Sequence, residues 1–316
     1  MDDLRILFFG TPEIACPVLN TLLESKLGKV VAVVTQPDKQ KGRDLQLQPP
    51  PVKELAQAHG IPVLQPVSAR DAAFINSVKE LQADLMIVIA YGQILPQSLL
   101  DISRHGALNI HTSLLPKYRG AAPIQHAVLN GDRETGVTIM KMDAGMDTGP
   151  IVSMERVPIS ENDTAATLHD TLGQVGANLL VETIPGYVRG EIKPVPQPEG
   201  ATYAGKIRKE AGRINWSDSA ESIGNRIRAF NPWPGTFTTL RSGEKSLILK
   251  IWKATQSSEA GEPGKILRVG DNGILVGCGK DSLRILELQK EGGKRLSVAQ
   301  FLAGNPMRVG EEFIHG

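Results

Sequence analysis

Residues 4–34 read LRILFFGTPEIACPVLNTLLESKLGKVVAVV and predict a strand, a helix and a second strand in succession. The apolar run at residues 4–9 ends in the turn-forming residues 10–13, after which apolar side chains recur at helical spacing. Residues 30–34 are a continuous apolar run rich in valine, which is typical of a parallel strand covered on both faces. The stretch therefore predicts a first βαβ unit.

The same alternation continues along the chain. Further short apolar runs are expected to be strands, at residues 61–64, 85–89 and 107–110. Helices are expected between them, near residues 52–59, 71–81 and 94–101. Alternating strands and helices are typical of a doubly wound α/β sheet.

The pattern changes after residue 134. Residues 137–140 and 151–154 flank a glycine-rich loop with no helix between them, so we expect an antiparallel hairpin that closes the sheet. Residues 164–189 carry apolar side chains at core spacing and predict a long helix packed on the sheet. We therefore predict an α/β fold with a Rossmann-like, mostly parallel sheet and helices on both faces.

A second domain is expected because the chain has 316 residues. Residues 190–200 hold three prolines and two glycines without apolar periodicity and indicate a boundary. We place the first domain at residues 1–189, a linker at residues 190–208 and the second domain at residues 209–316. The last part contains a helical stretch at residues 223–230. It also contains short apolar runs that predict strands, at residues 247–252, 264–269, 273–276 and 283–288. These short, evenly spaced strands predict a smaller C-terminal OB-like β-barrel.

The charge is divided unevenly between the two parts. Hydrophobic residues make up 41% and charged residues 22% of the chain, which excludes a disordered protein. The net charge is +1 overall, but residues 1–189 carry 16 Lys and Arg against 20 Asp and Glu, whereas residues 190–316 carry 19 against 14. A basic second domain suggests that it holds a polyanion, and a merely solubilising surface is the alternative.

Several classes of protein are disfavoured. The only cysteines, Cys16 and Cys278, allow no disulfide framework, and the first apolar run is too short for a signal peptide, so we expect a cytoplasmic protein. The first turn, Gly10-Thr11-Pro12-Glu13, lacks the glycines of a dinucleotide site, and no P-loop motif occurs. The histidines have no metal-ligand spacing, so we expect no metal.

Asn109 and His111 stand where the strand near residues 107–110 ends and the chain turns polar. Ligands bind at the carboxyl ends of strands in open α/β sheets. Because the two residues are two apart, their side chains project from the same face of the strand. An amide beside an imidazole suits acyl transfer, since the amide can stabilise an oxyanion and the imidazole can exchange a proton near neutral pH.

Asp147, in the glycine-rich loop of residues 143–149, is expected to orient the imidazole of His111. Each of these residues alone could equally be an ordinary strand-end or turn residue. Residues 113–116 follow the pair with the sequence SLLP, and they are expected to shape a loop whose main chain reads a flat heteroaromatic ligand.

These motifs together resemble those of the folate-dependent formyltransferases. The resemblance rests on NIHTSLLPKYRGAAPIQ at residues 109–125 and DAGMDTG at residues 143–149. It implies a formyl transfer from 10-formyltetrahydrofolate, with catalytic roles for Asn109, His111 and Asp147. It also implies that the folate lies near Ser113, Leu114, Leu115 and Pro116. The family usually has Ala or Gly where this chain has Thr112.

Three further features resemble the members of this family that act on methionyl-tRNA. They are FGTPE at residues 9–13, TQPDKQKGR at residues 35–43 and IRAFNPWPG at residues 227–235. The resemblance implies initiator methionyl-tRNA as the acceptor. Basic residues in the long loop 36–51 and around the end of the linker are expected to bind it, namely Lys39, Lys41, Arg43, Lys206, Arg208 and Lys209. Without the resemblance, these cations would be read as ordinary solvated charges.

Two other functions stay open from the sequence. One is a formyltransferase with the same core that acts on an amino-sugar nucleotide. The other is a noncatalytic RNA-binding protein on the same scaffold. We also expect a monomer that has no association with membranes.

Overall fold

A computed structural model describes residues 4–41, 46–242 and 245–314, and the chain divides into two compact units. The first unit comprises Met1–Pro123, Glu134–Pro158 and His169–Ala204, and the second comprises Ile124–Arg133, Ile159–Leu168 and Gly205–Gly316.

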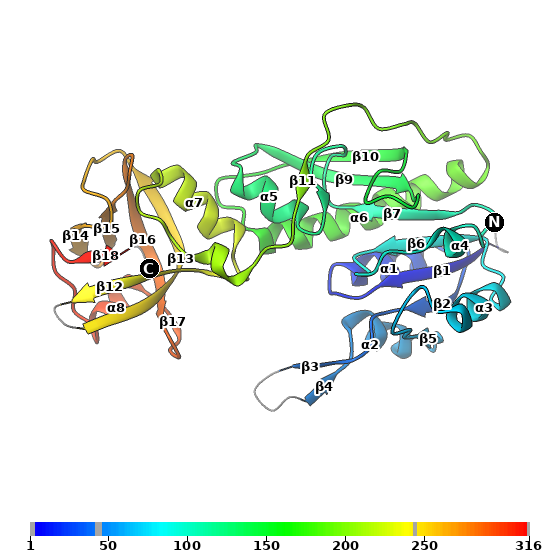
Figure 1. The fold of residues 1–316 in the computed structure, drawn as a ribbon, viewed down its shortest axis with the longest axis horizontal. Helices are drawn as coiled ribbons and strands as arrows, with labels where there is room; N and C mark the ends of the chain where they lie inside the picture. Colours follow the sequence, from blue (N-terminus) through cyan, green and yellow to red (C-terminus); the bar gives the residue numbers. More distant parts are fainter. Residues whose placement is uncertain (1–3, 42–45, 243–244, 315–316) are drawn as a thin grey trace. The chain divides into compact units, whose positions relative to one another are not determined.

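The first unit is built on a seven-stranded sheet with the order β10-β9-β7-β6-β1-β2-β5 (Figure 1). Its strands are β1 Arg5–Gly10, β2 Lys29–Val34, β5 Val63–Leu64, β6 Leu85–Ile89, β7 Ala107–His111, β9 Glu134–Lys141 and β10 Ile151–Pro158. Strands β5, β2, β1, β6 and β7 are parallel to one another, whereas β9 pairs antiparallel with both β7 and β10 at one edge. The mostly parallel sheet and its closing hairpin are confirmed.

The expected helices follow the strands, and one further helix, α5 at Pro123–Leu129, lies before β9 where the sequence predicted none. They are α1 Ala15–Glu24, α2 Pro51–Ala58, α3 Ala72–Glu80, α4 Gln97–Leu100, α5 Pro123–Leu129 and α6 Ala165–Val188. Leu7 and Phe9 of β1 share a buried cluster with Phe74 of α3 and Leu99 of α4. The opposite face packs closely on α6, because a Cβ added at Gly176 would lie 2.8 Å from Ile110 Cγ2. The predicted covering of both faces is therefore confirmed.

Two small sheets flank this core. Strands β3 Lys39–Lys41 and β4 Gln46–Gln48 pair antiparallel, so part of the predicted loop 36–51 is a β-ribbon. Strand β8 Arg119–Gly120 pairs in parallel with β11 Tyr203–Ala204, and Val195 forms a backbone bridge to Ile151. Val195 and Tyr203–Ala204 are therefore hydrogen-bonded through their backbones to β10 and β8 of the first unit.

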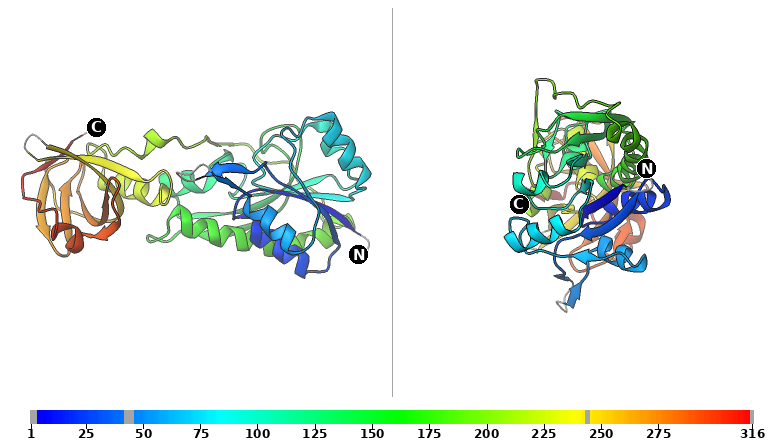
Figure 2. Two further views of the ribbon diagram at one scale, coloured as in Figure 1. Left: turned by 90° about the horizontal axis from the view of Figure 1, so that it is seen from below. Right: turned by 90° about the vertical axis from the view of Figure 1, so that its right-hand side faces the viewer.

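The second unit is a curled antiparallel sheet with the order β14-β15-β16-β13-β12-β18, and β17 pairs with β16 (Figure 2, yellow to red). Its strands are β12 Thr236–Ser242, β13 Lys245–Ser257, β14 Ile266–Gly270, β15 Gly273–Gly277, β16 Ser282–Lys290, β17 Arg295–Ser297 and β18 Glu312–Ile314. The edge strands meet, because Ile266 N donates to Glu311 O at 2.9 Å and Phe313 N donates to Gly264 O at 2.8 Å. This closure gives the barrel-like form that the short strands predicted.

The barrel encloses its own apolar core. The Trp216 ring stacks on Phe313 at a centroid distance of 5.4 Å, and its Nε1 donates to Thr238 Oγ1 at 2.9 Å. Three helical elements accompany the strands: the 3₁₀ helix η1 Lys209–Gly212, α7 Ala220–Ala229 and α8 Val298–Leu302. The side chain of Ser219 caps α7 by accepting a hydrogen bond from Ser222 N, and a capping box begins α8.

Candidate active site

Asn109 and His111 lie at the carboxyl end of β7, which β6 and β9 flank. Both side chains are buried, with 9% and 6% of their surfaces exposed. Ile110, between them, faces Gly176 of α6. Because side chains alternate along a strand, Asn109 and His111 share the opposite face, as the two-residue spacing predicted.

His111 has one ring nitrogen fixed by the backbone. Its Nε2 lies 2.9 Å from the carbonyl oxygen of Tyr118, which can only accept a hydrogen bond, so Nε2 carries a proton. The other ring nitrogen, Nδ1, lies 3.7 Å from Asp147 Oδ2. That distance is an ion-pair contact and is too long for a direct hydrogen bond. Nδ1 is therefore the position at which the ring can exchange a proton.

Asp147 is held from two sides. Its Oδ2 accepts a hydrogen bond of 2.7 Å from Gly120 N. Gln197 Nε2 donates to the carbonyl oxygens of Asp147 and Gly149, both at 2.8 Å. The backbone of Asp147 is left-handed, with φ of 53°, a conformation that costs free energy unless its surroundings hold it in place.

Arg119 extends this support. Its Nε and Nη2 donate to Gln197 Oε1 at 3.1 and 2.7 Å. The amide of Gln197 is thus oriented by Arg119 and in turn donates to the loop of Asp147. The first unit therefore contains a continuous chain of hydrogen bonds from a guanidinium to the carboxylate-bearing loop.

The side chain of Asn109 has no hydrogen-bond partner within the part of the chain that the structure describes. Its amide atoms are not among the fully buried side-chain atoms that lack a partner, so they remain accessible to a ligand. Asn109 is therefore available to donate to an oxygen atom placed beside His111.

The segment from Ser113 to Pro116 forms a fixed turn next to this pair. Thr138 Oγ1 donates to Ser113 O at 2.7 Å and accepts from Leu115 N at 3.1 Å. Ser113 Oγ donates to Lys117 O at 2.6 Å. Ser113 and Leu115 are buried, whereas Leu114 and Pro116 keep some exposed surface. The accessible parts of the turn are therefore apolar.

The basic residues expected to bind tRNA fall into two groups. Lys39 and Lys41 lie on β3 in the first unit, and Lys39 is exposed. Lys206, Arg208 and Lys209 are exposed in the second unit. Arg43 lies outside the described residues.

An ion pair and hydrogen bonds to Asp38, which is partly buried, fix the start of the β3–β4 ribbon. Lys53 Nζ lies 2.7 Å from Asp38 Oδ2, and Gln65 Nε2 donates to Asp38 Oδ1 at 2.8 Å. These hydrogen bonds, first that of Lys53 and then that of Gln65, lower the pKa of Asp38. The position from which the ribbon extends is therefore fixed by side-chain contacts within the first unit.

Sequence reasoning missed Arg119, Gln197 and Thr138 as parts of this site. Arg119 lies inside the recognised motif but received no role. Gln197 lies in the proline-rich segment, where no periodicity marks a contact, and it acts over a separation of 50 residues from Asp147. Only the folded backbone brings these residues together.

No cluster of three or more potential metal ligands occurs among residues 4–41, 46–242 and 245–314. Within the same ranges, no helix combines the length and apolar character needed to cross a membrane.

The chain matches two family models, Formyl transferase over residues 4–184 and Formyl transferase, C-terminal domain, over residues 206–306. It is 49% identical over 311 residues to the methionyl-tRNA formyltransferase of Geobacter sulfurreducens, covering 98% of this chain and 96% of that protein. It is 48% identical over 316 residues to the methionyl-tRNA formyltransferase of Geobacter metallireducens, covering 100% of both.

Solved structures show a similar fold at lower identity. HypX from Aquifex aeolicus in complex with tetrahydrofolic acid has a TM-score of 0.65 at 18% identity, covering 100% of this chain and 51% of that one. The N-formyltransferase from Helicobacter canadensis, in complex with folinic acid and dTDP-3-aminofucose, has a TM-score of 0.64 at 22% identity, covering 90% and 99%. At these identities the likeness concerns the fold alone.

Proposed function

The chain belongs to the formyl transferase family, and we propose that it transfers a formyl group from 10-formyltetrahydrofolate to the amino group of methionine on initiator methionyl-tRNA. The family resemblance that residues 109–125 and 143–149 indicated is thereby confirmed. The acceptor is supported by relatives of about half identical sequence over the full length, which are called methionyl-tRNA formyltransferases. The observation that carries the chemistry is the Asn109 amide, which has no hydrogen-bond partner among the described residues and projects from the same face of β7 as His111.

Asn109 has the oxyanion-stabilising role in this proposal. The donor supplies an electrophilic formyl carbon, and the neutral amine of methionine attacks it to form a tetrahedral intermediate. When this intermediate collapses, the bond between the formyl carbon and N10 of the folate breaks, N10 takes the proton that His111 received from the amine, and tetrahydrofolate leaves. As negative charge develops on the formyl oxygen, the Asn109 amide donates a hydrogen bond to it. Because this amide has no partner among the described residues, it donates without first breaking a hydrogen bond to the protein.

His111 accepts the proton that the attacking amine loses. Its Nε2 proton is held by Tyr118 O, so the incoming proton goes to Nδ1. The resulting imidazolium lies 3.7 Å from the Asp147 carboxylate, whose negative charge stabilises it. Gly120, Gln197 and Arg119 keep that carboxylate in place.

The folate is assigned to Ser113, Leu114, Leu115 and Pro116. Leu114 and Pro116 are half-buried and offer apolar surface. Such surface suits the face of a flat heteroaromatic ring, because small-molecule sites are lined mainly by apolar side chains. Thr138 bonds the main chain of this turn, so its surface is fixed before a ligand arrives.

The tRNA is assigned to two sets of cations, Lys39, Lys41 and Arg43 in the first unit and Lys206, Arg208 and Lys209 in the second. Exposed lysines and arginines supply phosphate contacts and therefore position an RNA without reading its bases. We assign residues 1–189 to the catalytic domain, 190–208 to a linker and 209–316 to a tRNA-binding domain. A cytoplasmic location and a monomeric state remain predictions.

Competing acceptors test this function. We expect formyl transfer from 10-formyltetrahydrofolate to methionyl-tRNA and no measurable transfer to a dTDP-linked amino sugar at equal concentration. Transfer to the amino sugar alone would favour that alternative acceptor. Binding of tRNA without any formylation would favour a noncatalytic RNA-binding protein.

A further inference from the structure

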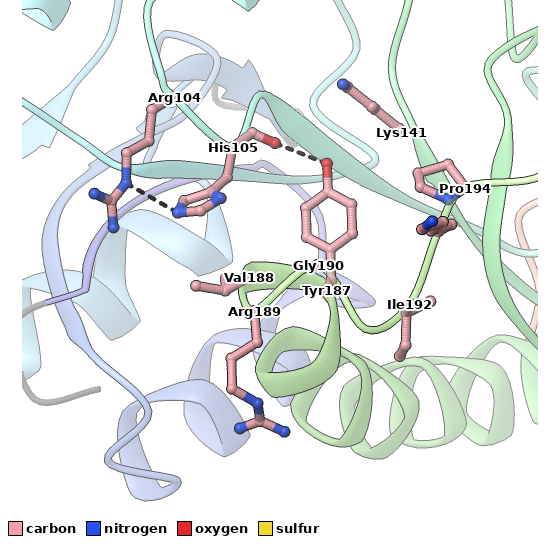
Figure 3. Close-up of a pocket in the computed structure, with 10 residues that line it drawn as sticks. Arg104, His105, Lys141, Tyr187, Val188, Arg189, Gly190, Ile192 and Pro194 are labelled. Carbon is pink, nitrogen blue, oxygen red and sulfur yellow. Dashed lines mark hydrogen bonds between the residues drawn. The ribbon is translucent and has the colours of Figure 1, made fainter.

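The first unit contains a hollow at the amino end of β7, away from the candidate active site. Arg104 and His105 immediately precede this strand, whereas His111 of the candidate active site lies at its carboxyl end. The hollow has a volume of about 350 Å³, which is the size of a small-molecule pocket. Its walls come from the turn before β7, the end of β9, the end of α6 and the segment that follows α6 (Figure 3).

The lining of this hollow is strongly cationic. It includes Arg104, Lys141, Arg189 and Lys193 and no Asp or Glu. Low-dielectric walls with charge of one sign concentrate counter-ions, so an anion is the expected occupant. The kind of anion depends on which of these four cations are free to bind it.

Both guanidinium groups are already engaged. Arg104 Nε donates to His105 Nε2 at 2.9 Å and lies 3.3 Å from Asp84 Oδ1. Arg189 Nε and Nη2 each donate to the Glu191 carboxylate at 2.7 Å. In Figure 3 the guanidinium of Arg189 is directed away from the rest of the hollow.

The two ammonium groups are free by comparison. Neither Lys141 nor Lys193 has an ion pair or a side-chain hydrogen bond within the described part of the chain. The stem of Lys141 rests against Gly106, where an added Cβ would lie 3.4 Å from the lysine Cε. Lysine binds phosphate as a compact point charge and needs no fixed bidentate geometry to do so. The free cations therefore favour a phosphate-bearing ligand.

A rigid apolar floor completes the hollow. Tyr187 is buried, and its hydroxyl donates to His105 O at 2.8 Å. Ile192 packs tightly against α6, because a Cβ added at Gly186 would lie 2.9 Å from it. With Pro194, these side chains form a surface for the organic part of a ligand.

We propose that this hollow binds a small molecule carrying a diphosphate group, with the phosphates held by Lys141 and Lys193 and the organic part against Tyr187 and Pro194. The site is separate from the formyl-transfer chemistry and does not depend on it. It uses only cations that the fold leaves without carboxylate partners.

Calorimetric titration of the full chain with inorganic pyrophosphate tests the proposal. We expect one saturable site with a dissociation constant below about 1 mM, and binding of inorganic phosphate at least about tenfold weaker. The double variant Lys141→Gln/Lys193→Gln should weaken pyrophosphate binding at least about tenfold, because both point charges are removed. Circular dichroism should show an unchanged fold, since both side chains are exposed.

Two control variants separate this site from diffuse surface charge. Arg189→Gln/Glu191→Gln keeps the net charge and removes a lining cation that is already engaged, so binding should change less than about twofold. Lys29→Gln/Lys79→Gln removes the same charge from exposed lysines elsewhere in the first unit, and it should also change binding less than about twofold.

Three results would overturn the proposal. They are an absence of pyrophosphate binding up to about 10 mM, equal affinity for phosphate and pyrophosphate, and an equal loss of binding in the Lys29/Lys79 and Lys141/Lys193 variants. If the latter variant does not fold, Lys193→Gln alone should weaken binding about threefold or more. None of these measurements uses formylation, so failure here leaves the proposed activity untouched.

Discussion

At the scale of single residues, the candidate site depends on which polar atoms the protein leaves without partners. His111 Nε2 is hydrogen-bonded to a backbone carbonyl, whereas the Asn109 amide has no hydrogen-bond partner among the described residues and its atoms are not fully buried. A donor that points at developing charge and needs no reorganisation contributes strongly to rate. Asn109 is therefore the residue whose loss should affect turnover most specifically.

We expect Asn109→Ala to lower kcat by about 100- to 1000-fold, because one oxyanion donor is lost. The KM for the folate donor should change little, since the interaction forms mainly as charge develops. Steady-state kinetics with methionyl-tRNA measure both values. Asn109→Asp keeps the shape but cannot donate and should be similarly slow, whereas near-normal turnover in either variant would remove the assigned role.

Cys278 lies in the core of the second unit, and its thiol should make the free energy of unfolding depend on pH in the alkaline range. Burial raises the pKa of its thiol from 9.0 to about 12, and only 2% of the residue is exposed. The unfolded chain therefore loses this proton at a lower pH than the folded chain. The stabilisation that this shift represents is complete below pH 9 and is lost as the pH rises towards 12.

Between pH 9 and pH 10, this one thiol should lower the free energy of unfolding by about 1 kcal/mol. Cys278→Ala should remove that part of the pH dependence, even if it lowers stability uniformly through lost packing. Urea unfolding at the two pH values measures the difference. Equal losses in the variant and the parent chain would show that the thiol does not titrate in this way.

At the scale of elements, the loop that carries Asp147 is held by residues from β8 and from the proline-rich segment. Arg119 and Gln197 form that support, and Gln197 donates to two carbonyl groups of the loop. Gln197 acts through the position of Asp147 and is therefore a positioning residue. Small displacements of such groups reduce rate far more than they reduce binding.

We expect Gln197→Met, which keeps the length of the side chain, to lower kcat by about 10- to 100-fold while the KM for methionyl-tRNA stays near its original value. Gln174→Met is the matched control, because Gln174 is exposed on α6 away from this network. A change in KM with an unaltered kcat would mean that Gln197 serves binding instead of positioning.

The elements that the sequence predicted are those with a strong local pattern, either a continuous apolar run or apolar side chains at helical spacing. The buried run of residues 30–34 and the helical spacing of residues 164–189 both have such patterns, and they form β2 and α6. The barrel strand β12 was missed, since five of its seven residues are Thr, Arg or Ser. The role of Gln197 could not be predicted either, because hydrogen bonds between residues far apart in the chain leave no pattern in the local sequence.

The β3–β4 ribbon carries the prediction that concerns tRNA. Lys39→Ala and Arg43→Ala should each raise the KM for tRNA and leave folate affinity unchanged, because each removes a phosphate contact. The slope of log affinity against log salt should fall by about 0.7 to 0.9 per contact. Lys29→Ala is the control on β2. Equal loss of folate affinity would place the ribbon in the folate pocket.

At the scale of the whole molecule, a net charge of +1 conceals two parts of opposite sign. Residues 1–189 carry more acids than bases and hold the Asn109, His111 and Asp147 constellation, whereas residues 190–316 carry more bases than acids. Lys and Arg side chains supply the contacts to the phosphates of a nucleic acid. This division suits an enzyme in which one part performs the chemistry and the other holds a polyanionic substrate.

The central claim is tested most directly by single-turnover transfer from 10-formyltetrahydrofolate to methionyl-tRNA, comparing initiator and elongator tRNA. We expect formylmethionyl-tRNA to form on the initiator species, only in the presence of the donor, and about 100- to 1000-fold more slowly with Asn109→Ala. No formylated initiator tRNA, or an unchanged rate in that variant, would contradict the account.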